Sequence, residues 1–210
     1  MASQDSSFQL RAYVFLDSLQ PQLAQYMAKT NKVYDPREHD AALFLEIAPA
    51  MEIHAKIDQA LKATRVRLGS MVTERVFGMM QVHHEDQGEV KAAGQAVLEA
   101  SNLKESDRAR CQILQNKIIR SVEQDHAIAF TGLAWGNMVL AGDSVLIMEA
   151  EPAAYLSIAC NEALKAADVN LVDIRVFGAT GRLIMSGTEA QIDYAAAAAT
   201  AALDDLNRGR

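Results

Sequence analysis

The sequence has few of the residues that stabilise secreted proteins or anchor proteins in membranes. It contains two cysteines, Cys111 and Cys160, which are too few for a disulfide framework. No apolar run approaches the roughly 18 residues that a membrane-spanning helix needs, and the polar residues 1–7 do not resemble a signal peptide. These absences predict a cytoplasmic protein with no membrane partner.

Positive charge is also scarce. The chain has 20 Lys and Arg against 27 Asp and Glu, a net charge of −7, whereas a protein that binds the phosphate backbone normally needs a basic face. We therefore expect no nucleic-acid partner. Half of the 210 residues are hydrophobic and 22% are charged, which is typical of a soluble globular protein.

The residues of common catalytic and metal sites lack the spacing that those sites require. His83 and His84 form the only histidine cluster, but neighbouring residues of a strand point to opposite faces and make a poor chelate. The stretch Gly178–Gly181 is not followed by the lysine and Ser/Thr of a phosphate-binding loop, so we expect a hairpin turn there. No catalytic triad can be placed. The sequence predicts no enzymatic activity, no metal site and no cofactor.

The most informative positive feature is a long internal repeat. Residues 10–69 recur at 113–172 without a gap, and the clearest match sets Glu46–Ala50 against Glu149–Ala153, 103 positions later. In this alignment Cys160 replaces Ile57, which predicts a small apolar residue in a core. A unit of this length is a whole small domain and not one repeat of a solenoid.

The repeat divides the chain into two domains of about 100 residues, each of an ordinary domain size. We expect a first domain at 8–103, a second at 111–207 and a polar, charged linker at 104–110. A further match, Arg75–Gly78 with Arg175–Gly178, is offset by 100 positions and predicts three extra residues in the first copy just before it.

Hydropathy predicts the same order in each copy: strand, loop, strand, helix, strand, strand and helix. In the first copy, residues 10–16 and 42–47 are expected to form strands, and Pro49 to open a helix. Residues 71–83 and 171–186 predict β-hairpins. The pattern therefore predicts an α+β fold, an antiparallel sheet with helices packed on it, close to a ferredoxin-like unit.

Helix-start signals follow both hairpins. Thr188 and Gln191 form a capping box, and Asp86 begins a close variant at the corresponding place in the first copy. The alanine run 195–199 favours a helix that lies close to its sheet.

Two pairs of charged positions are not explained by core packing. Lys62 and Lys165 are equivalent and lie near the ends of the matching helices, where they either interact with the helix dipole or contact a neighbouring particle. Glu74 and Arg75 stand in the first copy where the second is predicted to have Ile174 and Arg175, and an ordinary pair of surface charges is the alternative there.

At these residues the chain resembles a known family. The stretch Tyr13–Leu23 is similar to the opening of the tandem-domain, trimer-forming shell proteins of bacterial microcompartments, and most similar to the carboxysome-type subgroup with circularly permuted domains. The resemblance extends from about residue 10 to residue 206. Its further blocks are Glu46–Pro49, Ala60–Thr64, Glu74–Gly78, Asn161–Ala163, Arg175–Gly178, Gly181–Leu183 and Ile192–Asp193.

The resemblance implies a structural, non-catalytic role in a bacterial microcompartment shell. Two circularly permuted bacterial microcompartment (BMC) domains per chain would let a homotrimer form a pseudo-hexameric tile, which packs with other shell proteins. Small metabolites would cross its central opening. The matching residues imply a gate at Glu74 and Arg75, with Arg175 beside it, and tile-edge contacts at Lys62 and Lys165.

In the resembled subgroup two trimers can also stack face to face. Two loops of this chain, 35–40 and 130–136, depart from the family pattern, and an exposed Trp135 would serve a different contact. The alternative to a shell protein is a regulatory protein of tandem ferredoxin-like domains. Such a protein would bind a small molecule in a pocket with ordered polar groups and would not form tiles.

Overall fold

The computed structural model describes residues 8–31 and 33–208, in which each copy of the repeat forms one four-stranded antiparallel sheet. We call residues 8–103 copy 1 and residues 111–207 copy 2. The strand orders are β1-β2-β4-β3 and β5-β6-β8-β7. The strands are β1 (Gln9–Leu16), β2 (Ala41–Ala48), β3 (Arg67–Glu74), β4 (Phe77–His84), β5 (Gln112–Ile119), β6 (Ser144–Glu151), β7 (Asn170–Arg175) and β8 (Gly181–Gly187).

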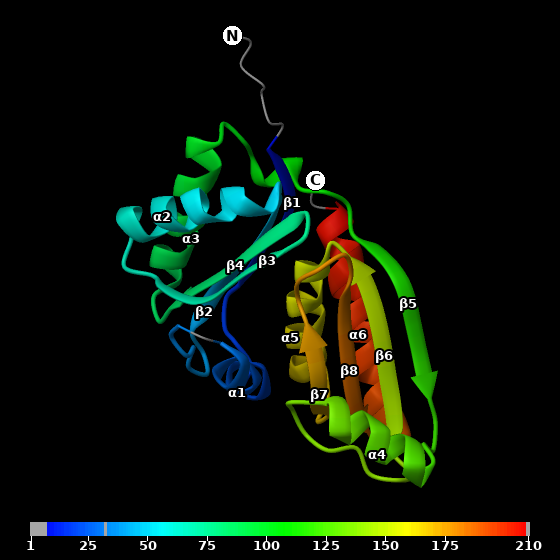
Figure 1. The fold of residues 1–210 in the computed structure, drawn as a ribbon. Helices are drawn as coiled ribbons and strands as arrows, with labels where there is room; N and C mark the ends of the chain where they lie inside the picture. Colours follow the sequence, from blue (N-terminus) through cyan, green and yellow to red (C-terminus); the bar gives the residue numbers. More distant parts are fainter. Residues whose placement is uncertain (1–7, 32, 209–210) are drawn as a thin grey trace.

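Two helices cover one face of each sheet, which confirms the predicted α+β class (Figure 1). They are α2 (Ile53–Ala63) and α3 (Gln87–Ala100) in copy 1, and α5 (Leu156–Ala166) and α6 (Glu189–Arg208) in copy 2. A 3₁₀ turn precedes α2 and α5: η1 (Ala50–Glu52) and η3 (Ala153–Tyr155).

The predicted helix-start chemistry is present at both third-helix positions. The Asp86 carboxylate accepts a hydrogen bond from the Gly88 N–H (2.7 Å). Thr188 and Gln191 bond reciprocally, with Thr188 N donating to Gln191 Oε1 (3.1 Å) and Gln191 N donating to Thr188 Oγ1 (3.4 Å). These bonds satisfy backbone donors that have no partner inside the helix.

Two further helices occupy segments that were predicted to be loops, and that prediction is wrong. They are α1 (Pro21–Thr30) and α4 (Gln124–Leu133), one after the first strand of each copy. Pro21 stands at the start of α1, where its missing N–H costs nothing, and Leu23, Ala24 and Met27 bury one face. Each helix packs on the sheet face opposite the other two helices, so both faces of both sheets are covered.

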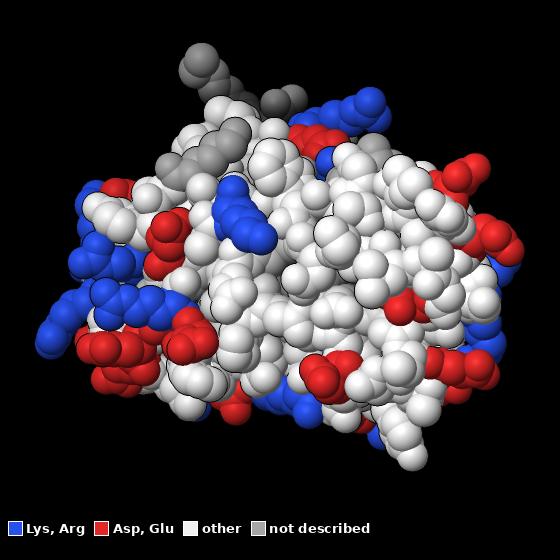
Figure 2. Space-filling view, turned by 90° about the horizontal axis from the view of Figure 1, so that it is seen from below, with Lys and Arg blue, Asp and Glu red and all other residues white. Residues whose placement is uncertain are grey.

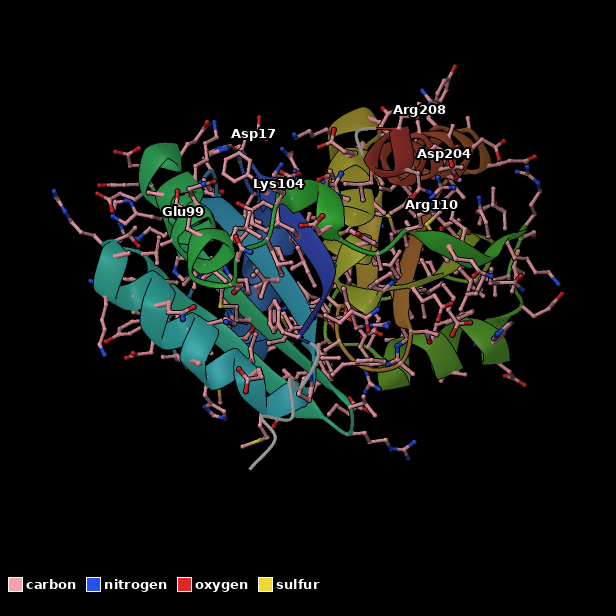
Figure 3. The ribbon with its side chains drawn as sticks, turned by 90° about the horizontal axis from the view of Figure 1, so that it is seen from above. Asp17, Glu99, Lys104, Arg110, Asp204 and Arg208 are labelled. Atoms are coloured by element: carbon pink, nitrogen blue, oxygen red, sulfur yellow. The ribbon has the colours of Figure 1, made fainter. Side chains whose placement is uncertain are left out.

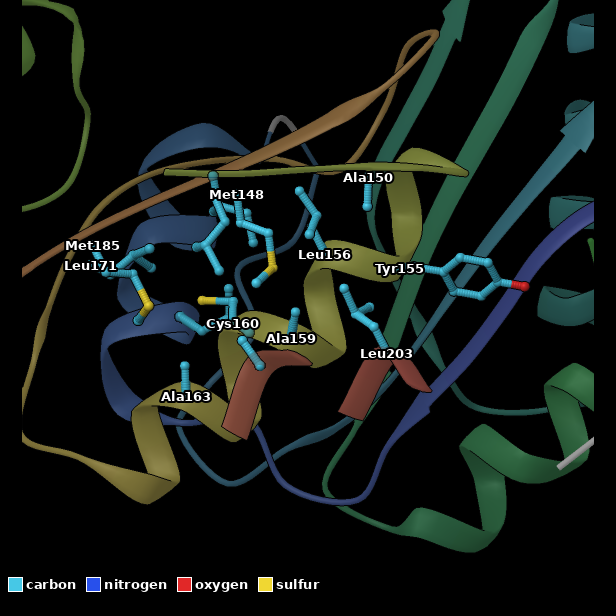
Figure 4. Packing of buried hydrophobic residues seen from close by; sticks show 14 of the residues in the cluster. Met148, Ala150, Tyr155, Leu156, Ala159, Cys160, Ala163, Leu171, Met185 and Leu203 are labelled. Atoms are coloured by element: carbon cyan, nitrogen blue, oxygen red, sulfur yellow. The ribbon is translucent and has the colours of Figure 1, made fainter. Parts of the chain in front are cut away.

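The cores follow this layering. In copy 1, residues such as Leu43 and Leu45 pack under α2 and α3. The other face of that sheet, with α1, is continuous with the apolar layer under α5 and α6 of copy 2. Cys160 is fully buried in this shared layer (Figure 4), as predicted, and burial raises the pKa of its thiol.

The segment between the sheets is hydrogen-bonded to both copies. It contains η2 (Glu105–Asp107), with Lys104 and Arg110 on either side (Figure 3). Arg108 donates to the Leu206 carbonyl at the end of α6 (3.0 Å), and Ala109 N donates to the Arg11 carbonyl in β1 (3.1 Å). The two sheets are therefore held at a defined angle by more than the chain connection.

Polar side chains reinforce the junction between the copies. Gln22 on α1 donates to the Val169 carbonyl (2.7 Å) and accepts from the Leu171 N–H (2.8 Å), which caps the free edge of β7. The Tyr155 side chain extends from η3 toward β1 (Figure 4), and its hydroxyl donates to the Ala109 carbonyl in the segment between the sheets (2.5 Å).

A buried ion pair lies in the middle of this junction. Arg11 Nε donates to Glu46 Oε1 (2.7 Å), and Glu46 Oε2 accepts from the Ala154 N–H in η3 (3.0 Å). Burial raises the pKa of the Glu46 carboxyl, while these hydrogen bonds favour its charged form. The Arg11 guanidinium also stacks on the Phe77 ring, 3.6 Å from the centroid.

None of the helices in the described part of the chain combines the length and hydrophobicity that a membrane crossing requires. Residues 1–7, on which the expected lack of a signal peptide depends, lie outside the described residues.

We predict that Glu46→Ala destabilises the fold by about 3 kcal/mol, because it leaves the largely buried Arg11 charge and the Ala154 N–H without their acceptor. Chemical denaturation measures the loss. Glu38→Ala, in an exposed loop, is the control and should change the free energy of unfolding by less than about 0.5 kcal/mol. A loss below about 1 kcal/mol for Glu46→Ala would contradict this role.

Candidate pore-lining site

The tips of two hairpins, one from each copy, meet beside the junction. In copy 1, Arg75 and Val76 connect β3 to β4, with Glu74 opposite Phe77 in the last pair of the ladder. In copy 2, residues 176–180 connect β7 to β8. A Cβ atom built on Gly178 would lie 3.4 Å from Glu74 Oε2, so the carboxylate of the first tip rests against the second tip.

The strand register corrects the predicted relation between these hairpins. Ile47 pairs with Gly78 in copy 1, and Ala150 pairs with Gly181 in copy 2, which is the same offset of 103 that relates the rest of the repeat. The three extra residues predicted in copy 1 do not exist. The match between Arg75–Gly78 and Arg175–Gly178 is a local coincidence of sequence.

Glycine contacts support this equivalence. A Cβ on Gly78 would lie 2.3 Å from the Ala50 carbonyl oxygen, and a Cβ on Gly181 would lie 2.5 Å from that of Ala153. Only glycine lets the fourth strand of each copy approach the 3₁₀ turn so closely. The two glycines, at positions 78 and 181, are therefore the sequence signal that could have revealed the correct alignment of the hairpins.

By the corrected alignment, Arg75 corresponds to Gly178 and Glu74 to Phe177. Both 75 and 178 have a positive φ, 54° and 104°. Glycine adopts this conformation freely, whereas it costs a residue with a Cβ about 1–2 kcal/mol. Copy 1 therefore holds an arginine where the backbone favours glycine, and such exceptions concentrate at functional positions.

The Glu74 and Arg75 side chains are not neutralised by other charged groups of the described residues. Within residues 8–31 and 33–208 neither makes an ion pair, and Arg75 is exposed at the tip. The base of the hairpin is fixed by Phe77, which lies against the Arg11 guanidinium. The result is two charged side chains without an ion-pair partner in the described residues, on a hairpin whose base is packed.

Arg175 lies on the flank of the second hairpin and not at its tip. It ends β7, opposite Arg182, and its guanidinium is 5.2 Å from the Phe177 ring. Arg182 is paired instead with Asp173 (Nε to Oδ2, 2.7 Å). The predicted correspondence of Arg75 with Arg175, and of Glu74 with Ile174, is therefore wrong, although all four residues belong to the two adjoining hairpins.

The two equivalent lysines differ in their partners. Lys62 pairs with Asp58 on its own helix (2.7 Å), and its side chain is 76% exposed. Lys165 bonds to Glu162 (2.8 Å) and, across the junction, to Asp17 of copy 1 (3.2 Å), and is 32% exposed. Both lie in the last turn of their helix, where a cation interacts favourably with the helix dipole.

Candidate chemistry elsewhere is accounted for locally. His83 is buried and bonded to Gln81 (3.2 Å), and burial lowers the pKa of its imidazole. His84 accepts a hydrogen bond from the Asp86 N–H (2.9 Å). The described residues include no group of three or more His, Cys, Asp or Glu side chains placed to hold a metal ion.

The alternative, a regulatory protein, predicts a ligand pocket with ordered polar groups. Two hollows along α6 are open grooves, each lined by three alanines of residues 196–202 together with several polar and charged side chains. Their open shape does not favour the regulatory alternative.

Comparison with known proteins identifies close relatives. The family model described as the CsoS1D N-terminal domain matches residues 10–107. The carboxysome shell protein CsoS1D of Hydrogenovibrio crunogenus is 50% identical over 199 residues, covering 94% of this chain and 97% of the relative. The carboxysome shell protein CcmP of Synechococcus elongatus is 41% identical, covering 95% of this chain and 93% of the relative.

Solved structures agree over the same length. The fused permuted hexameric shell protein MSM0275 from the RMM microcompartment has a TM-score of 0.92 at 43% identity and covers 94% of this chain and 98% of its own. The double ringed trimeric shell protein MSM0271 has a TM-score of 0.89 at 32% identity and covers 94% and 97%. The chain therefore belongs to the CsoS1D family of carboxysome shell proteins.

Proposed function

We propose that this protein is a non-catalytic structural tile of a microcompartment shell, and that three chains form a pseudo-hexameric ring around a central opening. The carrying observation is the match, over nearly the full length, to fused shell proteins named as hexameric or trimeric. Each chain supplies two of the six sectors, residues 8–103 and 111–207, joined by the linker 104–110. Other shell proteins surround the tile, and small metabolites cross its opening.

Glu74, Arg75 and Arg175 are proposed to line that opening. The two hairpin tips adjoin within the chain, so a threefold axis beside them would gather six tips from three chains. Three Arg75 guanidinium groups on one axis repel one another unless each meets a carboxylate, and Glu74 of a neighbouring chain is the nearest candidate by position. Arg175, on the hairpin flank, adds positive charge behind this ring.

A gate needs two arrangements of similar energy. With Arg75 paired to Glu74 of the next chain the opening is blocked, and with Arg75 turned away it is wide. The exposed Arg75 side chain and the fixed Phe77 base favour a motion of side chains and tips without a change in the sheet.

Lys62 and Lys165 are proposed to lie at the outer edge of the tile. The ammonium group of Lys62 is exposed and fits a contact with a neighbouring tile. Lys165 is held by Asp17 and Glu162, and its first role is to brace the junction between the copies.

A face-to-face contact between two trimers is proposed on the side that carries α1 and α4. Seen from this side, the centre of the molecule has little charge, and lysine, arginine and acidic residues gather toward the rim (Figure 2). Four large apolar side chains of copy 2 are exposed on α4 and the loop after it: Ile128, Trp135, Met138 and Leu140. An apolar surface of this kind marks an interaction site.

Native mass spectrometry and electron microscopy of the purified protein test the tile. A mass three times 22.9 kDa, and hexagonal particles roughly 65–70 Å across or sheets of them, would support it. A monomer or dimer that never tiles would refute it and favour the regulatory alternative.

We predict that Glu74→Ala leaves the trimer intact but opens or disorders the ring of Arg75 side chains, because the arginines lose the carboxylate that neutralises them. Crystal structures of the variant and of wild type provide the comparison. Glu85→Ala, an exposed position in a turn, removes the same charge elsewhere and should leave the ring unchanged. A closed, ordered Arg75 ring in Glu74→Ala would defeat the proposed gate.

Arg75→Gly should raise the free energy of unfolding by about 0.5–1 kcal/mol. Relief of the positive φ gains about 1–2 kcal/mol, and the added freedom of the unfolded glycine returns about 0.5–1 kcal/mol. Arg175→Gly, in a strand, should instead lose stability. Denaturation at matched chain concentration distinguishes the two variants, and a destabilised Arg75→Gly would show that this arginine is not kept at a conformational cost.

A further inference from the structure

The junction inside the chain uses only one of two equivalent pairs of surfaces. It joins the β1–α1 side of copy 1 to the α5–β7 side of copy 2. The repeat places an equivalent β5–α4 side on copy 2 and an equivalent α2–β3 side on copy 1. Neither of these has a counterpart inside the chain.

Exposed apolar residues mark the vacant α2–β3 side. Met51 is 69% exposed, whereas its equivalent in the other copy, Ala154, is buried in the junction. Met71 is 39% exposed, whereas its equivalent Ile174 is 8% exposed. Large apolar side chains of copy 1 are therefore exposed to solvent at positions that copy 2 buries in the junction.

Three side-chain oxygens accept main-chain N–H groups across the junction inside the chain. Glu46 Oε2 accepts from Ala154 N at 3.0 Å. Gln22 Oε1 accepts from Leu171 N at 2.8 Å. Asn161 Oδ1 accepts from Gln20 N at 2.9 Å.

All three acceptors are retained at the equivalent positions, although the residue types change. A shift of 103 positions relates Glu46 to Glu149 and Gln22 to Asp125, and relates Asn161 back to Asp58. The N–H groups that they would meet belong to Met51, Leu68 and Glu123.

The proposed donors are placed to be capped. Met51 lies in the first turn of η1, where an N–H has no acceptor within the helix. Leu68 lies on the edge strand β3, and its carbonyl accepts from Tyr34 N (3.1 Å), as the Leu171 carbonyl of β7 accepts from Asn137 N (2.8 Å). At both edge strands the carbonyl is therefore bonded to the same loop position. The difference is that the Leu171 N–H of β7 has the Gln22 side chain as its acceptor, whereas β3 has no such side chain from the described residues.

Two of the three acceptors, Glu149 and Asp58, are oriented by hydrogen bonds within the chain. Thr180 Oγ1 donates to Glu149 Oε1 (2.5 Å), as Arg11 donates to Glu46 Oε1. Lys62 holds Asp58 Oδ2. In Glu149 and in Asp58 one carboxylate oxygen is held within the chain, and the other is available to a partner.

We propose that the junction between chains repeats the junction within the chain: the β5–α4 side of copy 2 docks on the α2–β3 side of copy 1 of the next chain. Glu149 and Asp125 accept from the next chain's Met51 and Leu68 N–H groups, and the next chain's Asp58 accepts from Glu123 N–H. This contact is head-to-tail, and such a contact closes a ring when its rotation divides a full turn, as the proposed three-chain tile requires. The inference rests on the proposed trimer and names the contacts that hold it.

The repeated junction is weaker than the original. Gln22 also donates to the Val169 carbonyl (2.7 Å), and Asn161 donates to the Ser18 carbonyl (3.1 Å). Asp125 and Asp58 have no N–H to donate in these places. The ion pair of Asp17 with Lys165 is also lost, because its equivalents, Arg120 and Lys62, are both cations.

Substitutions at Asp125 provide a test in both directions. Asp125→Ala removes the acceptor for Leu68 N–H, whereas Asp125→Gln keeps it and adds the donor that Gln22 supplies within the chain. We expect Asp125→Ala and Glu149→Ala each to raise about ten-fold the concentration at which half of the chains are assembled. Asp125→Gln should lower that concentration, and Glu149→Gln should lie between wild type and Glu149→Ala.

Native mass spectrometry over a dilution series is the measurement, with circular dichroism as a check of folding. Asp205→Ala removes the same charge on the side of α6 that faces α5 and Arg108, away from the β5–α4 and α2–β3 sides, and should assemble as wild type does. A trimeric wild type with Asp125→Ala and Asp125→Gln unchanged, or shifted together, would overturn this junction and leave the tile standing. A wild type that does not assemble would refute the tile itself. If an alanine variant fails to fold, the assembly concentration of Asp125→Gln decides: a value below that of wild type supports the junction, and an unchanged or higher value overturns it.

Discussion

The arrangement of the two copies depends on one carboxylate. Glu46 sits in the second strand of copy 1, and its two oxygens bond to Arg11 on one side and to the Ala154 N–H of copy 2 on the other. The Arg11 guanidinium in turn lies on Phe77, at the base of the hairpin that carries Glu74 and Arg75. One buried acid thus couples the position of copy 2 to the base of the proposed gate.

Duplication of a fold supplies two such carboxylates, and among the described residues only Glu46 accepts a main-chain N–H of the other copy. Glu149 keeps the geometry of Glu46 with Thr180 in place of arginine. A chain of two equivalent units with one junction made internally has one complementary pair of surfaces left over. The physical consequence is an assembly of chains in which internal and external junctions alternate, and in which the external ones lack two amide donors and an ion pair.

At the hairpin tips the two copies do not need the same residues for folding. The register is identical in both hairpins, and the glycines at 78 and 181 are required equally by the close approach to the 3₁₀ turns. Beyond these constraints, copy 1 has Glu74 and Arg75 where copy 2 has Phe177 and Gly178. An arginine at positive φ is not favoured by the local backbone, so its presence reflects a requirement other than stability.

Much of the fold could be predicted from residue patterns. Alternating hydropathy located the strands, capping residues located the starts of α3 and α6, and the repeat fixed two copies of one unit. The helices α1 and α4 were not predicted, because ten residues with a short apolar stripe resemble a loop until a sheet face is available to bury Leu23 and Met27.

The sequence by itself determined the repeat, the α+β class and an acid, Glu74, that distinguishes copy 1 from copy 2, because these follow from periodicity and identity along the chain. Only the tertiary structure decided which residues correspond at the tips. A four-residue match favoured Arg175 as the counterpart of Arg75, but hydrogen-bond register and the space around Gly181 require Gly178. Correspondence in a sheet is set by pairing across strands, and that pairing is not encoded in any short stretch of sequence.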